Sequence, residues 1–297
     1  MNIANVVSLL PSGTEIVAAL GRSDALVGVS HECDYPASVA RLPRVTSTAI
    51  DHTADAAMVD ATVRAQASAG HSLYTVDWDL VETLAPDLIV TQALCEVCAV
   101  SESECRMYAA RLTPRPLIAT LAASTLDGVL ADIQGVADAF GDEVAGVSLV
   151  TALRQRIAYV HEKLAAAKAP RPRVAVIEWT EPLFIAGHWV PEIIRRAGGT
   201  DVVGIPGSHS TVVTREAISA AHPDIVLVAP CGYDVQRAAR VARELAWPDG
   251  VKVWAVDANS LLSRPGPRLI DGIETLAQIF HPALFGAPRP DCALPIA

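Results

Sequence analysis

The sequence predicts an α/β protein of two Rossmann-like lobes with parallel sheets, joined by a long backbone α-helix, with a ligand cleft between the lobes. Three observations predict this fold. Short continuous apolar runs alternate with amphipathic helical segments, the same order of motifs occurs twice, and one long helical period lies between the two copies. Apolar strands that alternate with helices are typical of a parallel sheet covered on both faces.

The two copies share three paired motifs in the same order. The stretch NVVSLLPSGTEIVAALG (5–21) pairs with RVAVIEW…HWVPEIIRRAGG (173–199), and LVETLAPDLIVTQALC (80–95) pairs with AISAAHPDIVLVAPC (217–231). Helices expected at 126–141 and 270–281 form the third pair. Within the first pair, Gly21 and Gly198 stand where the C-terminal cap of a helix favours a residue with positive φ.

A helical segment at 125–170 separates an N-terminal lobe at 1–124 from a C-terminal lobe at 171–297. Its apolar residues recur at steps of three and four, which is a helical period; they are Val150, Leu153, Ile157, Val160 and Leu164. A continuous helix over 142–168 would extend about 40 Å. The prolines of APRPR end it. The alternative is a single doubly wound sheet with one long helix.

Charge and composition exclude some classes of partner. The chain has 297 residues and a net charge of −10, so it lacks the clustered Lys and Arg of a nucleic-acid-binding protein. No run approaches the ~18 to 20 apolar residues of a membrane span, so no membrane insertion is expected. The first residues, MNIANVVSLLPSGTEIV, lack a basic region and a long apolar core. We therefore expect a cytoplasmic protein, or a periplasmic one if a leader has been removed.

Polar and aromatic residues gather in the loops that follow the predicted strands, as in VGVSHECDYP (27–36), and these loops should line the cleft. The candidate ligand-binding residues are Ser12, His31, Glu32, Tyr35, Trp78, Glu178, Trp179, His188, Trp189, Ser208, His209 and Arg264. Simpler roles compete with ligand binding. Ser12 with Glu15 matches a capping box that opens the first helix, the tryptophans can pack in the core, and Arg264 can cap the following helix.

Cysteine and histidine suggest a metal-binding set. Thiolate and imidazole together suit zinc, copper(I), iron or the cobalt of a corrinoid. The candidate metal ligands are His31, Cys33, Cys95, Cys98 and Cys231, of which Cys95 and Cys98 form a C-x-x-C motif. The duplication aligns His31 with His209 and Cys95 with Cys231. The alternative is that these cysteines are small buried apolar residues at strand ends.

Four stretches, SLLPSGTEIVAALG, LVGVSHECDYP, VETLAPDLIV and SRPGPRLIDGIETLA, resemble the helical-backbone (class III) substrate-binding proteins of ABC importers, most closely the cobalamin-binding ones. The resemblance implies a two-lobed receptor that holds cobalamin, a related corrinoid or another metal-complex ligand in its cleft. It also implies docking on an ABC permease through surface carboxylates of both lobes.

The cysteines and histidines in the loops depart from that family and leave two alternatives. The first is a cytosolic binder of a transition metal such as Zn or Fe through the Cys/His set. The second is an enzyme on the same scaffold, with Cys33 or Cys95 as nucleophile and His31 or His188 as its acid–base partner. No nucleophile elbow, phosphate loop or cofactor fingerprint accompanies these residues, so we expect a binding protein and not an enzyme.

Overall fold

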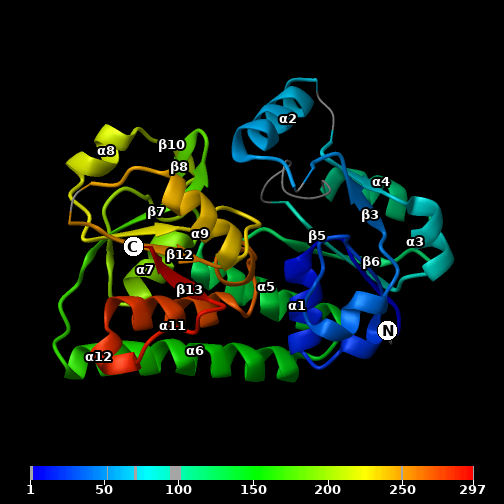
Figure 1. Cartoon of the computed structure of the whole chain (residues 1–297). Coiled ribbons are helices and arrows are strands. Elements are labelled where there is room, and N and C mark those ends of the chain that lie inside the picture. The colour runs from blue at the N-terminus through cyan, green and yellow to red at the C-terminus, as the bar shows by residue number, and fades with distance from the viewer. Residues whose placement is uncertain (1–2, 52, 70–71, 94–101, 249, 297) are drawn as a thin grey trace. The chain divides into compact units, whose positions relative to one another are not determined.

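The computed structural model of the chain describes residues 3–51, 53–69, 72–93, 102–248 and 250–296 (Figure 1). The chain separates into two compact α/β units. The first comprises Met1–Ala123 and Asp127–Thr151, and the second comprises Ser124–Leu126 and Ala152–Ala297.

The first unit is built on a four-stranded sheet in the order β2-β1-β5-β6, and every neighbouring pair is parallel. The strands are β1 (Val6–Ser8), β2 (Leu26–Val29), β5 (Leu88–Gln92) and β6 (Leu117–Leu121). Both central strands are buried along their whole length, which explains why they read as continuous apolar runs in the sequence.

Helices and one small antiparallel ribbon complete this unit. The ribbon pairs β3 (Thr46–Thr48) with β4 (Tyr74–Val76). The helices that lie in the first unit or begin beside it are α1 (Pro11–Ala19), α2 (Ala56–Ser68), α3 (Trp78–Leu84), α4 (Glu102–Ala109) and α5 (Leu126–Ala139), with short 3-10 turns at Ser23–Ala25 and Ala37–Arg41. The segment 47–79 thus supplies most of β3 together with α2, β4 and the start of α3.

The start of α1 corrects one expectation from the sequence. Ser12 was expected to cap this helix with Glu15, but the cap position is Leu10 and no side chain caps it. Pro11 occupies the first helical position, where its fixed φ and missing N–H are tolerated, so the helix begins two residues before the start that a Ser12 cap implies. Ser12 and Glu15 both lie buried within the helix.

The helix ends predicted at glycine are confirmed. Gly21 follows α1 with φ of 75°, and Gly198 follows α7 (Val190–Arg196) with φ of 90°. Both values lie in the left-handed region that glycine adopts at low cost.

The second unit repeats the topology of the first. Its parallel strands follow the order β9-β7-β11-β12, which matches β2-β1-β5-β6 strand for strand. They are β7 (Arg173–Thr180), β9 (Thr200–Asp201), β11 (Ile225–Val228) and β12 (Lys252–Val256). The sequence did not predict the three antiparallel additions, β8 (Leu183–Ile185), β10 (Thr211–Val212) and β13 (Ala293–Ile296).

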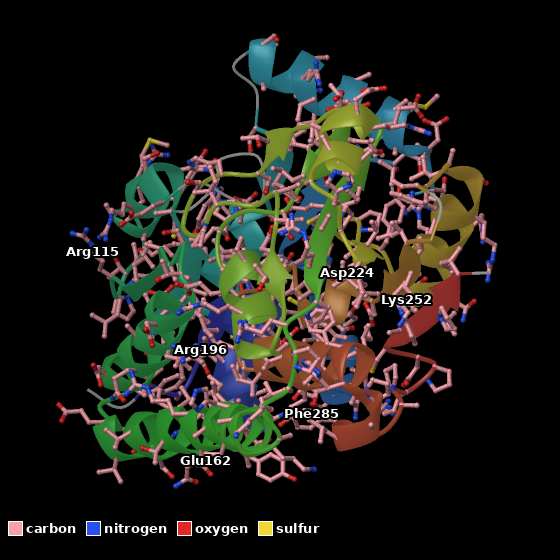
Figure 2. All side chains as sticks on the ribbon, turned by 90° about the vertical axis from the view of Figure 1, so that its left-hand side faces the viewer. Arg115, Glu162, Arg196, Asp224, Lys252 and Phe285 are labelled. Atoms are coloured by element: carbon pink, nitrogen blue, oxygen red, sulfur yellow. The ribbon has the colours of Figure 1, made fainter. Side chains whose placement is uncertain are left out.

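The two ends of this second sheet differ in chemistry. Asp224 and Lys252, both labelled in Figure 2, lie at the amino-terminal ends of β11 and β12, where a carboxylate oxygen of Asp224 accepts the N–H of Arg173 at 2.7 Å. The carboxyl-terminal ends carry the candidate site residues instead.

The remaining helices of this unit are α8 (Arg215–Ala220), α9 (Val235–Glu244), α10 (Ala258–Leu261), α11 (Leu269–Phe280) and α12 (Pro282–Phe285).

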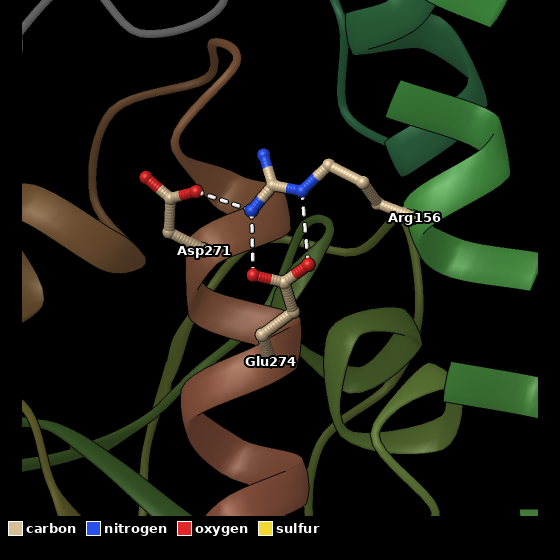
Figure 3. A network of polar contacts seen from close by, with 3 residues as sticks. All are labelled: Arg156, Asp271 and Glu274. Atoms are coloured by element: carbon tan, nitrogen blue, oxygen red, sulfur yellow. Dashed lines mark hydrogen bonds and ion pairs between the residues drawn. The ribbon is translucent and has the colours of Figure 1, made fainter. Parts of the chain in front are cut away.

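The long helix expected at 142–168 is α6 (Glu143–Ala166), which begins in the first unit and ends in the second. Four of its predicted apolar positions are buried, namely Val150, Leu153, Ile157 and Val160. Within the second unit, Arg156 of α6 contacts Glu274 and Asp271 of α11, and Figure 3 shows the guanidinium between the two carboxylates. This network fixes the second half of α6 on α11.

Candidate functional site

A carboxylate at the end of β7 organises the carboxyl-terminal edge of the second sheet. The hydroxyl of Ser210 donates to Oε1 of Glu178 at 2.7 Å, and the N–H of Gly187 donates to Oγ of Ser210 at 3.2 Å. Burial raises the pKa of Glu178, and the hydrogen bonds from Ser210 and Gly187 offset part of that rise. The Glu178 carboxylate thereby joins the end of β7 to the loop that contains Gly187 and to the loop that contains Ser210.

His188 is tied to the second of these loops through its backbone. Its N–H donates to the carbonyl of Ser208 at 2.6 Å, and its carbonyl accepts the N–H of Gly207 at 2.9 Å. His188 makes these two bonds with a φ of 50°, in the left-handed region that is uncommon for a residue other than glycine. The sequence placed His188, Ser208 and His209 in separate loops, and the structure brings them together.

The imidazole of His188 lies between two other rings. Its centroid is 5.3 Å from that of His209, edge to face at 87°, and 5.6 Å from that of Trp189. Nε2 of His188 is buried without a hydrogen-bond partner. Burial, followed by the charge of His209, lowers the pKa of His188. His209 itself is exposed.

Two tryptophans predicted to bind ligand have different surroundings. Trp189 is buried, and its indole N–H donates to the carbonyl of Leu262 at 2.7 Å, as in a core residue. Trp179 is only partly buried and packs edge-on against Tyr233 at 5.6 Å, while the guanidinium of Arg237 lies 3.7 Å from the Tyr233 ring centre. Trp179 is therefore a rigidly supported indole with part of its surface open to a ligand.

Three further candidates lie in the second unit. Cys231 is exposed in the loop after β11, and its N–H donates to the carbonyl of Glu178 at 3.0 Å. Ser208 is also exposed. Arg264 is buried. Cys231 and Glu178 thus lie at the ends of the neighbouring strands β11 and β7.

In the first unit, His31 is held by a chain of hydroxyl groups. Its backbone N–H donates to Oγ1 of Thr46 at 3.0 Å, and Nδ1 lies 2.7 Å from the same oxygen. Thr46 in turn donates to Oγ of Ser30 at 3.1 Å. These contacts orient the imidazole beside the Tyr74 ring, 5.8 Å away.

The neighbouring residues of this loop divide into buried and exposed. Cys33 is 1% exposed, and its sulfur lies 3.1 Å from Oγ1 of Thr14, which is the setting of a small buried packing residue. Glu32 is partly buried and its N–H faces Oγ of Ser30 at 3.4 Å. Tyr35 is 49% exposed, so its ring is accessible to a ligand.

Trp78 has partners that account for its position. It stacks on Tyr108 of α4 with ring centres 4.5 Å apart, and its indole N–H donates to Oε1 of Glu104 at 3.4 Å. Asp77 caps α3 by accepting the N–H of Leu80. This pairing joins α3 to α4.

The Cys/His metal-binding set stays a prediction. Cys95 and Cys98 lie outside the described residues, so the C-x-x-C motif has no structural description. Among the residues that the structure describes, no group of three or more His, Cys, Asp or Glu side chains is arranged to hold a metal ion.

Sequence reasoning missed several residues that build these surfaces. Ser210 bridges Glu178 to Gly187, and Thr46 with Ser30 orients His31. Gly187 is required because a Cβ there would overlap the Ser208 carbonyl oxygen and lie 2.7 Å from the His209 carbonyl carbon. In the sequence, the dipeptide Gly-His before Trp189 was the available signal that the backbone at Gly187 closely approaches the backbone of Ser208 and His209.

The family model described as periplasmic binding protein matches residues 6–247. The chain belongs to this family. It is 25% identical over 281 residues to a vitamin B12-binding protein of Vibrio cholerae serotype O1, covering 91% of this chain and 86% of the relative. It is also 25% identical to an ABC transporter substrate-binding lipoprotein of Bacillus subtilis, over 94% of this chain and 81% of that relative. The solved structure of a periplasmic haem-binding protein of Pseudomonas aeruginosa superposes with a TM-score of 0.73 at 21% identity. The superposition covers 99% of this chain and 98% of that protein.

Family membership overturns the expected location. The cytoplasmic assignment was wrong, because the family consists of periplasmic binding proteins and one relative is a lipoprotein. It rested on the composition of the first residues. Those residues form β1 and α1 of the fold and so carry no information about export.

Membership also decides between the broad classes of function. The chain is a substrate-binding protein of the ABC-importer type and not an enzyme, because its relatives are binding proteins. Among the described helices, none is long and apolar enough to cross a bilayer.

Proposed function

We propose that the chain binds a corrinoid and delivers it to an ABC permease. The observation that carries the proposal is the sequence relationship to a vitamin B12-binding protein along 91% of this chain. The likeness to the haem-binding structure, at 21% identity, concerns the fold alone.

The surroundings of Trp179 and Tyr35 support a flat organic ligand. Trp179 is the last residue but one of β7, and Tyr35 lies in the loop after β2, so each is near the carboxyl-terminal edge of its own sheet, where ligands of open α/β folds bind. Trp179 is braced by Tyr233, and Tyr35 is half exposed. Aromatic faces of this kind suit contact with a macrocycle.

Delivery to a permease rests on the same relationship, together with the net charge of −10. Exposed carboxylates on each unit would provide the docking contacts. Stimulation of the cognate permease ATPase in proteoliposomes by the loaded chain, and not by the ligand-free chain, tests this step.

Ligand identity is tested by titrating the purified chain with hydroxocobalamin and, separately, with haemin. We expect saturable 1:1 quenching of tryptophan fluorescence by the corrinoid. A ligand at a hundred times its dissociation constant should add about 2.7 kcal/mol to the free energy of unfolding. Saturable binding of haemin with no response to hydroxocobalamin would assign the haem class instead.

A matched pair of tryptophan variants locates the binding surface. Trp179→Leu should weaken corrinoid binding by at least tenfold. Trp247→Phe should leave it unchanged, because Trp247 packs near α9 with its indole N–H on the carbonyl of Ala242. Equal affinities in both variants would remove Trp179 from the proposed site.

A further inference from the structure

The rings of His188 and His209 form an edge-to-face contact at a spacing that is also compatible with a shared metal ion. The centroids are 5.3 Å apart and the ring planes are at 87°. A metal ion bound at about 2.1 Å by one nitrogen of each ring, with tetrahedral bond angles, would place the two centroids about 5.2 Å apart. The observed separation therefore accommodates one ion between the rings.

The second observation is the buried Nε2 of His188, which has no hydrogen-bond partner. A buried polar atom without a partner costs free energy, so such atoms are rare in folded proteins and call for an explanation. A metal ion at this nitrogen would satisfy its lone pair.

Three restraints hold the two rings in place. The backbone of His188 makes both of its hydrogen bonds to Gly207 and Ser208, immediately before His209. Ser210, immediately after His209, is fixed to Glu178. The left-handed backbone of His188 is a strained conformation held by these contacts, and strain of this kind gathers at functional sites. The pair is therefore preorganised.

We propose that His188 and His209 form a two-imidazole site for a divalent transition-metal ion such as Zn²⁺, Ni²⁺ or Co²⁺. The described residues contain no group of three potential ligands around one point, so water completes the coordination. Two histidines on one side of an ion leave adjacent positions open, which a donor atom of a cargo molecule can take. The site is independent of the corrinoid proposal, because the flat ring of a corrinoid leaves only opposite axial positions, never two adjacent ones.

The test uses the full chain with Cys95, Cys98, Cys231 and Cys292 replaced by serine, so that the two remaining cysteines, Cys33 and Cys105, are both buried. Titration with CoCl₂, followed by visible absorption, and with NiCl₂, followed by calorimetry, should give one equivalent per chain. The Co²⁺ spectrum should lack thiolate charge-transfer bands. Ni²⁺ should bind more tightly than Co²⁺.

Two variants and one control decide the outcome. His209→Ala changes an exposed side chain, and His188→Asn keeps a residue that tolerates positive φ. Each should weaken metal binding by at least tenfold. The control His161→Ala replaces an exposed histidine of α6 and should bind as the parent does.

A separate readout is protection from diethylpyrocarbonate, measured by mass spectrometry. Added Zn²⁺ should protect His209 and leave His161 reactive. Failure of the parent to bind one equivalent, or an affinity of His209→Ala within twofold of the parent, would overturn the proposal even if His188→Asn did not fold. Corrinoid binding in the same preparations shows separately whether the proposed function stands.

Discussion

The hydroxyl of Ser210 donates to the carboxylate of Glu178 at 2.7 Å and accepts the N–H of Gly187 at 3.2 Å. A single oxygen atom thereby connects the end of β7, the turn before α7 and the loop that carries His209. The surface around His209 depends on this one side chain.

Replacing Ser210 by alanine should destabilise the protein. Ser210→Ala leaves the carboxylate of Glu178 and the N–H of Gly187 each without this partner, and such losses cost about 1 to 3 kcal/mol in buried surroundings. Urea unfolding followed by tryptophan fluorescence measures the change. Four of the five tryptophans, Trp179, Trp189, Trp247 and Trp254, lie in the second unit. Ser208→Ala, in the same loop and exposed, is the control, and an equal effect of both variants would contradict the bridging role.

The raised pKa of Glu178 predicts a pH dependence of stability. The ordinary value is 4.5 and burial raises it, so the native state holds this proton at pH values where the unfolded chain has lost it. Glu178 therefore lowers the free energy of unfolding progressively as the pH rises from about 4.5 through the raised pKa. Below 4.5 both states are protonated and the contribution vanishes.

Glu178→Gln tests that dependence, because glutamine has no titrating proton and its amide oxygen can still accept from Ser210. The difference in stability between wild type and variant should change with pH across this range and then become constant. Glu181→Gln, at an exposed position in the turn after β7, should leave the wild-type profile unchanged. A difference between Glu178→Gln and wild type that is the same at every pH contradicts the assignment.

The contact between α6 and α11 predicts that replacing Arg156 by lysine lowers the free energy of unfolding. Nε and one terminal nitrogen of its guanidinium contact the two oxygens of Glu274 at 2.9 and 2.6 Å, and the same terminal nitrogen contacts Asp271 at 2.6 Å. These bonds raise the pKa of Arg156. An ammonium group cannot reproduce the bidentate geometry. Because all three side chains are more than a third exposed, Arg156→Lys should cost only about 1 kcal/mol. Arg154→Lys, at an exposed position of the same helix, is the control in urea unfolding.

The sequence predicted the parts of the fold that depend on local pattern and on repetition. The apolar period of α6 located that helix to within two residues at each end, since Glu143 and Ala166 replace the expected 142 and 168. The paired motifs anticipated that β2-β1-β5-β6 and β9-β7-β11-β12 share one order. The antiparallel strands β8, β10 and β13 were missed because each is two to four residues long and too short for a periodic signal.

The candidate site was less predictable because its contacts join residues distant in sequence. The repeat aligned His209 with His31, whereas the ring that His209 contacts within its own unit is that of His188. That contact depends on the positive φ of His188 and on backbone hydrogen bonds to Gly207 and Ser208. No pattern in the sequence around His188 signals a left-handed histidine. The capping role expected for Ser12 was also wrong, because α1 starts at Pro11, two residues before the start that a Ser12 cap implies.

Two glycine-to-alanine substitutions should have opposite effects on stability. Gly187→Ala places a Cβ against backbone atoms of Ser208 and His209, and backbone cannot move aside as a flexible side chain can. The loop must then shift away from His188, which breaks the hydrogen bonds between them. We expect a loss of about 1 to 3 kcal/mol, the range of overpacked positions.

Gly135 provides the matched substitution. It is exposed within α5, and a Cβ added there meets nothing within 4 Å. Alanine has the higher helix propensity, so Gly135→Ala should raise the free energy of unfolding by about 0.5 to 1 kcal/mol. Both variants are compared with wild type by urea unfolding, and metal titration is repeated on each. Gly187→Ala should also lose affinity for Co²⁺ while Gly135→Ala keeps it, because only the first displaces His209. Retained stability and Co²⁺ affinity in Gly187→Ala would show that the loop tolerates displacement and that the close approach at Gly187 does not fix the two histidines.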